Sequence, residues 1–334
     1  MRMGINLPFR KEDGNSVSLQ DIASRAALIE RLGFDGIWVG DTVGRWNTTG
    51  VDSLMWLLAA ASGTKTIELG TAVLVVPLRY PVELAQRILS LYALSGERFT
   101  CAVGSGSLPL DFDAVGVEHA DRFKLFNKGV PTLRALLNGE TVGTANIHPW
   151  PDMVGKPRLL VASWYNGSWI KKAAEGYDGW VASGLNSTFA ELREGIKRYR
   201  DYGGKRALVA TVGINLSMTS PTLTDDTNFT LRCPADEARE RIERLAELGY
   251  DDLLVTGGTS YAAGEMDEEA LSQIIALRPK GEAKVNLEAQ PHEGDPRSQD
   301  PVCRRFINLR TMTSPFGLRA MICDSASSSI SSAA

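Results

Sequence analysis

The chain has 334 residues, of which 43% are hydrophobic and 23% charged, a composition typical of a globular protein with a well-buried core. Its 36 Lys and Arg and 40 Asp and Glu give a net charge of -4 without a dense basic cluster, which excludes general nucleic-acid binding. Four cysteines without a CxxC pair and three scattered histidines predict neither a disulfide framework nor a metal centre. We find neither a signal peptide nor the roughly 20 apolar residues that span a bilayer, and we predict a cytoplasmic location without membrane contact.

Apolar strands alternate with helical segments along the chain. The first helical pattern opens at Ser18 and ends at Gly33, a residue type common after helix C-termini. The predicted strands are residues 3–8, 34–41, 67–76, 99–104, 158–163, 178–183, 207–215 and 252–256. The predicted helices are residues 18–32, 51–61, 81–95, 122–138, 168–175, 188–202, 234–249 and 267–277.

This alternation predicts the α/β class and a (β/α)8 TIM barrel in a single domain over residues 1–284. A doubly wound open sheet is the alternative, although no GxGxxG motif follows the first strand. Residues 285–334 lack periodic apolar positions and end in a stretch rich in Ser and Ala. We predict a low-periodicity, disordered tail there.

Two connections are longer than the rest, residues 139–157 and 217–233. The second follows a predicted strand C-terminus, the side on which barrel enzymes build their active sites. It is therefore either a cover over a substrate or a surface loop without a role.

The first candidate functional residues follow the second predicted strand. Asp41 places a carboxylate at the rim of the barrel, as a catalytic group or as a loop hydrogen-bond acceptor. Trp46 lies in the polar loop after it, either as a wall for a flat ligand or as a loop anchor. Trp164 and Tyr165 offer further aromatic lining, with core packing as the alternative.

Three turns of small polar residues follow later strands. Gly104-Ser105-Gly106-Ser107 follows the fourth, where backbone N–H groups can approach an anion closely, although tight turns also use this pattern. Asn166-Gly167-Ser168 precedes a predicted helix, whose dipole favours a phosphate, and Ser183-Gly184 follows the sixth strand. Together they predict a phosphorylated cofactor. Because the chain has no GxSxG, no HExxH and no metal-spaced carboxylates, we expect an organic cofactor to supply the chemistry.

The chain resembles the bacterial-luciferase-like monooxygenases, a family of flavin- or deazaflavin-dependent barrel oxidoreductases. Three stretches carry the resemblance: ERLGFDGIWVGD at 30–41, LGTAVL at 69–74 and PVELAQRILSLYALSGERFTCAVGSG at 81–106. The last is the most specific, because it joins a helix, the turn after it and the GxG after the fourth strand. The likeness covers about residues 1–280.

The resemblance implies a cofactor ring at the C-terminal mouth of the barrel. The ring would rest against a bulge at Ala72-Val73, where many members have a non-prolyl cis peptide. We predict that Gly104, Ser105 and Gly106 also bind the cofactor. The phosphate would bind at residues 166–168 and 183–184. Where many relatives have His this chain has Thr42, and where some deazaflavin enzymes have Glu it has Ser107.

We therefore predict an oxidoreductase, a monooxygenase that uses reduced FMN and dioxygen on a small organic substrate. The partners expected are a separate flavin reductase and a second copy of the chain in a dimer. One alternative is a reductase or dehydrogenase that uses the deazaflavin coenzyme F420. Another is a flavin-binding protein without catalysis.

Overall fold

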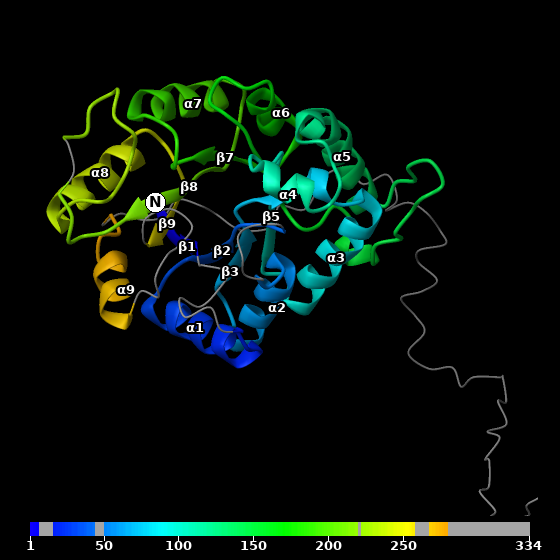
Figure 1. Cartoon of the computed structure of the whole chain (residues 1–334), viewed down its shortest axis with the longest axis horizontal. Coiled ribbons are helices and arrows are strands. Elements are labelled where there is room, and N and C mark those ends of the chain that lie inside the picture. Colours follow the sequence, from blue (N-terminus) through cyan, green and yellow to red (C-terminus); the bar gives the residue numbers. More distant parts are fainter. Residues whose placement is uncertain (7–15, 44–49, 220–221, 258–266, 280–334) are drawn as a thin grey trace, which may run out of the picture. The chain divides into compact units, whose positions relative to one another are not determined.

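The structure is a computed structural model that describes residues 1–6, 16–43, 50–219, 222–257 and 267–279. Within these ranges the parallel strands close into an eight-stranded barrel with helices around the outside, as Figure 1 shows. The predicted TIM barrel is confirmed, and the open-sheet alternative is wrong. The division at residues 284 and 285 remains a prediction, because residues 280–334 lie outside the described ranges.

The strands follow the predicted order with shorter bounds. They are β1 (Arg2–Asn6), β2 (Gly36–Val39), β3 (Glu68–Thr71), β4 (Leu74–Val75), β5 (Phe99–Gly104), β6 (Leu159–Ala162), β7 (Gly179–Ser183), β8 (Ala207–Ile214) and β9 (Asp252–Gly257). The α-helices are α1 (Leu19–Leu32), α2 (Ser53–Gly63), α3 (Pro81–Leu94), α4 (Pro109–Asp113), α5 (Arg122–Leu137), α6 (Trp169–Gly176), α7 (Phe189–Asp201), α8 (Ala235–Glu247) and α9 (Glu268–Ile275). Short 3-10 helices are η1 (Val76–Leu78), η2 (His119–Asp121) and η3 (Pro151–Met153).

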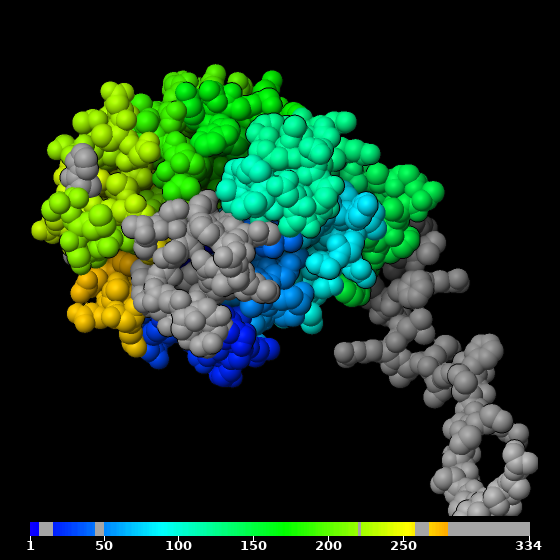
Figure 2. Space-filling model, in the orientation of Figure 1, coloured from blue at the N-terminus to red at the C-terminus, as the bar shows by residue number. Residues whose placement is uncertain are grey.

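Local sequence signals set several helix ends. Ser18 and Asp21 form a reciprocal capping box at the start of α1, and Gly33 ends that helix with φ at 90°. Thr188 and Glu191 form a reciprocal capping box at the start of α7. In the space-filling view the outer helices follow chain order, from blue α1 through green α7 to orange α9 (Figure 2). No described helix is long and apolar enough to cross a membrane.

The predicted third strand, residues 67–76, is divided into β3 and β4. The peptide bond between Ala72 and Val73 is cis and lies between the two pieces. β3 pairs with both β2 and β5, and β4 continues the pairing with β5. The two short strands therefore occupy one position of the barrel and close it.

Alternate residues of each strand point into the barrel and form three layers. The layer at the N-terminal ends of the strands is charged or polar: Arg2, Glu68, Thr100, Arg158, Arg206 and Asp252. Arg206 donates to both oxygens of Glu68 at 2.8 Å and to Asp252 at 2.8 and 2.9 Å. This layer closes one end of the barrel with paired charges.

The middle layer is apolar and is filled mainly by Trp38, which is 1% exposed. Its ring uses space that neighbouring glycines leave open: a Cβ on Gly70 would lie 2.2 Å from Trp38 Cε3, and one on Gly4 2.9 Å from Cδ1. The rest of this layer is Ala102, Leu160, Val181, Leu208 and Leu254. The cavity described next starts above it.

Candidate active site

The third layer, at the C-terminal ends of the strands, forms the floor of a cavity of about 510 Å³. Its members are small and carry no charge: Asn6, Gly40, Ala72, Gly104, Ala162, Ser183, Ala210 and Thr256. Because none of these side chains fills the barrel as Trp38 does one layer below, the interior stays open at this end. A concave site of this size at the C-terminal face is where TIM-barrel proteins bind ligands.

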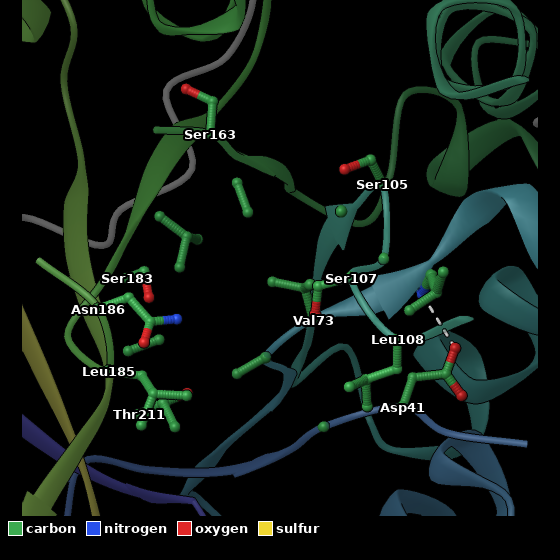
Figure 3. Close-up of a pocket in the computed structure, with 18 of the residues that line it drawn as sticks. Asp41, Val73, Ser105, Ser107, Leu108, Ser163, Ser183, Leu185, Asn186 and Thr211 are labelled. Atoms are coloured by element: carbon green, nitrogen blue, oxygen red, sulfur yellow. Dashed lines mark hydrogen bonds between the residues drawn. The ribbon is translucent and has the colours of Figure 1, made fainter. Parts of the chain in front are cut away.

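The floor is apolar on the side of β3, β4 and β5. Ala72 and Val73 lie there, and a Cβ on Gly104 would be 2.4 Å from Val73 Cγ2. Gly104 is therefore required to leave room for Val73 at the cavity wall. Across the cavity Figure 3 shows Ser183, Leu185, Asn186 and Thr211 facing Val73, Ser107 and Leu108.

Asp41 lies at the rim and is 6% exposed. Its carboxylate accepts two hydrogen bonds from Arg79, at 2.5 and 2.8 Å, and one from the N–H of Val75 at 2.9 Å. Burial by itself lowers the pKa of Arg79, but Asp41 and then Asp52 more than offset this and raise it. The carboxylate thus fixes β4 beside the cavity. Its catalytic role remains a prediction.

The next residue, Thr42, also lines the cavity. Its hydroxyl donates to Asp111 Oδ1 at 2.6 Å, and the N–H of Val43 donates to the same oxygen at 2.9 Å. Asp111 belongs to α4, a short helix that the sequence did not predict, and is 3% exposed. This contact joins the loop after β2 to the segment after β5.

The segment after α4 carries a cation at a helix N-terminus. Arg122 begins α5, lines the cavity and donates to the carbonyl of His119 at 3.1 Å. One turn later the ring of Phe126 lies 5.0 Å from that of Trp169, the first residue of α6. Ser168, the N-cap of α6, lines the same cavity. Helix packing therefore brings a guanidinium and the N–H groups that begin α6 to one wall.

Most of the predicted site residues meet in this one cavity. They are Asp41, Ala72, Val73, Gly104, Ser105, Gly106, Trp164, Gly167, Ser168 and Ser183. Their predicted roles in cofactor or substrate binding are neither supported nor excluded by this placement alone.

Two of the predicted residues that the structure describes do not line the cavity. Asn166 is exposed and Gly184 is buried, and neither lines the cavity. The N–H of Gly184 donates to the carbonyl of Ala210 at 2.7 Å, so strand pairing uses it. Trp46 lies outside the described ranges.

Sequence reasoning missed Arg122, Thr211 and Arg232, which also line the cavity. Arg122 had a local signal, a basic residue at a predicted helix start on the C-terminal side of the barrel. Thr211 had none, because it reaches the cavity through an irregular pairing inside β8. Arg232 is the only described residue of the 217–233 connection among those that line the cavity.

No group of three His, Cys, Asp or Glu among the described residues is arranged to hold a metal ion. Burial raises the pKa of the Cys101 thiol to about 12, and this residue packs outside the barrel interior. The polar groups that line the cavity are hydroxyls, amides, the guanidinium groups of Arg122 and Arg232, and the carboxylates of Asp41 and Asp111.

Fold and site together define a TIM barrel with a ligand-sized cavity at the C-terminal face. One side of this cavity carries small apolar residues, and another carries polar and cationic residues. The model of the luciferase-like monooxygenase family matches residues 1–228, and the chain belongs to this family.

Similar curated proteins include a monooxygenase and a dehydrogenase. The 4-hydroxyprotoasukamycin monooxygenase of Streptomyces nodosus subsp. asukaensis is 33% identical over 117 residues, which are 34% of this chain and 31% of that protein. The F420-dependent glucose-6-phosphate dehydrogenase of Beutenbergia cavernae is 34% identical over 169 residues, 46% of this chain and 50% of that protein. The chain thus matches between about a third and a half of the length of these curated relatives.

A solved structure with the same fold is the oxygenating constituent of 3,6-diketocamphane monooxygenase from Pseudomonas putida, in complex with FMN. Its TM-score is 0.64 at 17% identity, and the match covers 82% of this chain and 96% of that one. At this identity the likeness concerns the fold alone.

Proposed function

We propose that this protein is an oxidoreductase that uses reduced FMN and dioxygen to oxygenate a small organic substrate. The observation that carries the proposal is the division of one cavity into a wall of small apolar residues and a polar end with a guanidinium. Reduced flavin supplies the electrons and activates oxygen when it is bound. The protein itself has to bind, orient and desolvate the reactants.

The apolar wall suits the flat ring of a flavin. Ala72, Val73 and Gly104 leave a shallow surface without charges or large side chains. Arg79 and Asp41 hold the neighbouring β4 in place through paired charges. An apolar wall also keeps water away from the reacting atoms, which limits wasteful side reactions.

The polar end suits a phosphate. Arg122 supplies a permanent positive charge, and α6 supplies N–H groups without partners in their own helix. Of the predicted phosphate-binding residues, Gly167 and Ser168 lie at this wall. A Cβ on Gly167 would approach the carbonyl of Trp164 to 3.2 Å, so the turn fits a residue without a side chain.

A second candidate is a reductase or dehydrogenase that uses coenzyme F420. The 169-residue similarity to an F420-dependent glucose-6-phosphate dehydrogenase favours it. FMN and F420 both carry a flat ring and a phosphate, so the same walls serve either. Thr42 and Ser107, in place of His and Glu, argue against transferring that dehydrogenase's activity on a sugar phosphate to this chain.

We also propose that a separate flavin reductase supplies the reduced cofactor and that two copies of the chain form a dimer. Both rest on the likeness to the family. Light scattering of the purified protein tests the dimer. Turnover that depends on an added flavin reductase and its nicotinamide substrate tests the reductase.

The decisive experiment is a titration of the purified protein with FMN and with coenzyme F420, followed by turnover assays. Quenching of flavin fluorescence reports FMN binding, and the intrinsic fluorescence of F420 reports its binding. Oxygen uptake with reduced FMN supports the monooxygenase, and substrate-dependent change of F420 absorbance supports the alternative. FMN binding without either activity indicates a flavin-binding protein, and binding of neither cofactor overturns the proposal.

A further inference from the structure

We infer that Asn6, Thr211 and Thr256 bind an uncharged oxygen of the substrate, as in a ketone or an alcohol, opposite the cofactor ring. We call these three residues the hydrogen-bonding arc. The inference rests on the proposed function, because the ring defines which face of the cavity receives the substrate.

The arc spans three consecutive strands, from Thr211 on β8 through Thr256 on β9 to Asn6 on β1, and Thr211 lies farthest from the Ala72-Val73 wall. Around the barrel, β8 is four strands from β3 in one direction, through β2, β1 and β9, and four in the other, through β5, β6 and β7. Thr211 on β8 is therefore diametrically across the cavity from that wall. Figure 3 shows Thr211 across the cavity from Val73. A ring resting on Ala72 and Val73 turns its open face, and hence the substrate, towards the arc.

The backbone of Thr211 is unusual. Its φ is 63°, in the left-handed region that a β-branched residue seldom adopts. The pairing of β8 with β9 shifts between Val209 and Val212, which is a bulge that adds residues to β8 and places Thr211 on the cavity wall. A glycine would adopt this conformation without strain. The side chain of Thr211 therefore has a use that compensates for its backbone conformation.

The other two members lie next to it on consecutive strands. Thr256 pairs with Gly213 of β8, and Val255 pairs with Ile5, one residue before Asn6. All three side chains line the cavity. Within the described ranges the structure gives no hydrogen bond for the side chain of Asn6, Thr211 or Thr256, although each carries a donor and an acceptor. Groups of this kind at a cavity wall need a partner from the ligand once water is displaced.

The arc is neutral, and this defines the substrate class. A hydroxyl or amide can form the hydrogen bonds that a carbonyl or hydroxyl oxygen of a ligand needs. A carboxylate removed from water also needs a cation to neutralise its charge. A cation lies close to the arc: Arg232 Nε would be 3.0 Å from a Cβ on Gly213, which pairs with Thr256. An anionic probe therefore has to be part of the test.

The test uses three six-membered-ring probes of similar shape on the protein loaded with its cofactor. Cyclohexanone carries a carbonyl oxygen, methylenecyclohexane replaces that oxygen with carbon, and cyclohexanecarboxylate carries a charge. Their dissociation constants are measured by ligand-observed NMR. The variants are Thr211→Val, which removes the hydroxyl and keeps the branched shape, and Thr211→Ser, which keeps the hydroxyl. Thr132→Val is the control, since Thr132 is half-buried on α5, does not line the cavity and bonds its own helix.

We expect cyclohexanone to bind the wild type more tightly than either other probe. Thr211→Val should weaken cyclohexanone by about 3- to 10-fold and leave methylenecyclohexane unchanged, and Thr211→Ser should retain the preference. Thr132→Val should match the wild type. Thr211→Gly should lose the preference while its melting temperature stays equal to or above that of the wild type, because the strain is relieved.

Two results overturn the inference. One is equal affinity of the wild type and Thr211→Val for cyclohexanone, and the other is tighter binding of the carboxylate than of the ketone. These outcomes are distinct from failure of the proposed function. If the proposed function is wrong, the wild-type protein fails to bind FMN and coenzyme F420 in the cofactor titration described above.

Discussion

The two ends of the barrel interior are built from the same strands but have opposite properties. At the N-terminal ends, Arg2, Glu68, Arg206 and Asp252 fill the cross-section with paired charges, each no more than 7% exposed. At the C-terminal ends the inward positions hold small neutral residues and leave a cavity of about 510 Å³. Only four residues separate the two layers along each strand, as from Glu68 to Ala72.

The difference shows how the barrel separates stability from binding. The charged layer pairs its carboxylates with its own guanidinium groups, so it has little capacity to bind anything else. The small-residue layer leaves hydroxyls and amides without protein partners, and these become available to a ligand. Trp38, in the layer between, keeps the cavity from extending through the barrel. Changes at the first end should therefore alter folding, and changes at the second should alter binding.

The largest effect on stability should come from Arg206→Ala. The change leaves Glu68 and Asp252 without their bidentate partner in a buried site. We expect a loss of about 3–5 kcal/mol in the free energy of unfolding, measured with urea. Cofactor affinity of the folded fraction should not change. Arg31→Ala is the control, because its pair with Glu268 is exposed and should contribute about 0.2–1 kcal/mol.

The second effect concerns the cationic wall of the cavity. Arg122→Ala should weaken FMN binding by about 10- to 100-fold, since a hydrogen bond to a charged group contributes about 1.5–3 kcal/mol. Riboflavin, which lacks the phosphate, should bind both proteins equally. Lys128→Ala, on the exposed side of the same helix, is the matched control. An equal loss for FMN and riboflavin would place the phosphate elsewhere.

The third prediction compares the same substitution in two adjacent layers. Ala72→Phe should fill the cavity at the apolar wall and weaken FMN binding, with little change in melting temperature. Ala102→Phe, one layer lower and 0% exposed, should overpack the interior and cost about 1–3 kcal/mol of stability. Thermal melts and FMN titrations of both variants test this. If Ala72→Phe unfolds the protein and keeps its FMN affinity, Ala72 is an ordinary core residue.

The smallest predicted effect is a change in stability at acidic pH, and it concerns Glu68. Burial by itself raises the pKa of Glu68, but Arg206 above all, with Arg2 and Arg158, lowers it well below its usual value of 4.5. A proton thus binds the unfolded chain more readily than the folded one. The resulting stabilisation is complete above about pH 4.5 and is lost progressively as the pH falls below it.

Glu68→Gln removes this titrating group. Urea unfolding of both proteins between about pH 6 and pH 3 should therefore give a shallower loss of stability for the variant. Parallel curves would show that Glu68 titrates alike in the folded and unfolded states. The cofactor site should not affect this comparison, because the charged layer lies at the other end of the barrel.

The sequence by itself determined the barrel and the ends of several helices. These features depend on residues only a few positions apart, so they can be predicted from the sequence alone. They are the apolar periodicity, the helix caps at Ser18 and Thr188, and Gly33 at a helix end. The C-terminal ends of the strands in a parallel barrel meet on one face. Residues predicted to follow strand ends are therefore close together in the structure, and ten of the predicted site residues line one cavity.

What remained was decided by contacts between segments distant in sequence. The sequence placed Asp41 at a strand end, but only the fold brought Arg79 and the N–H of Val75 to its carboxylate. It placed Arg122 at a helix start, and only the packing of Phe126 on Trp169 set that start beside α6. The bulge that places Thr211 on the cavity wall comes from the pairing of β8 with β9. Such positions depend on the register between strands and the packing between helices, which local sequence periodicity does not encode.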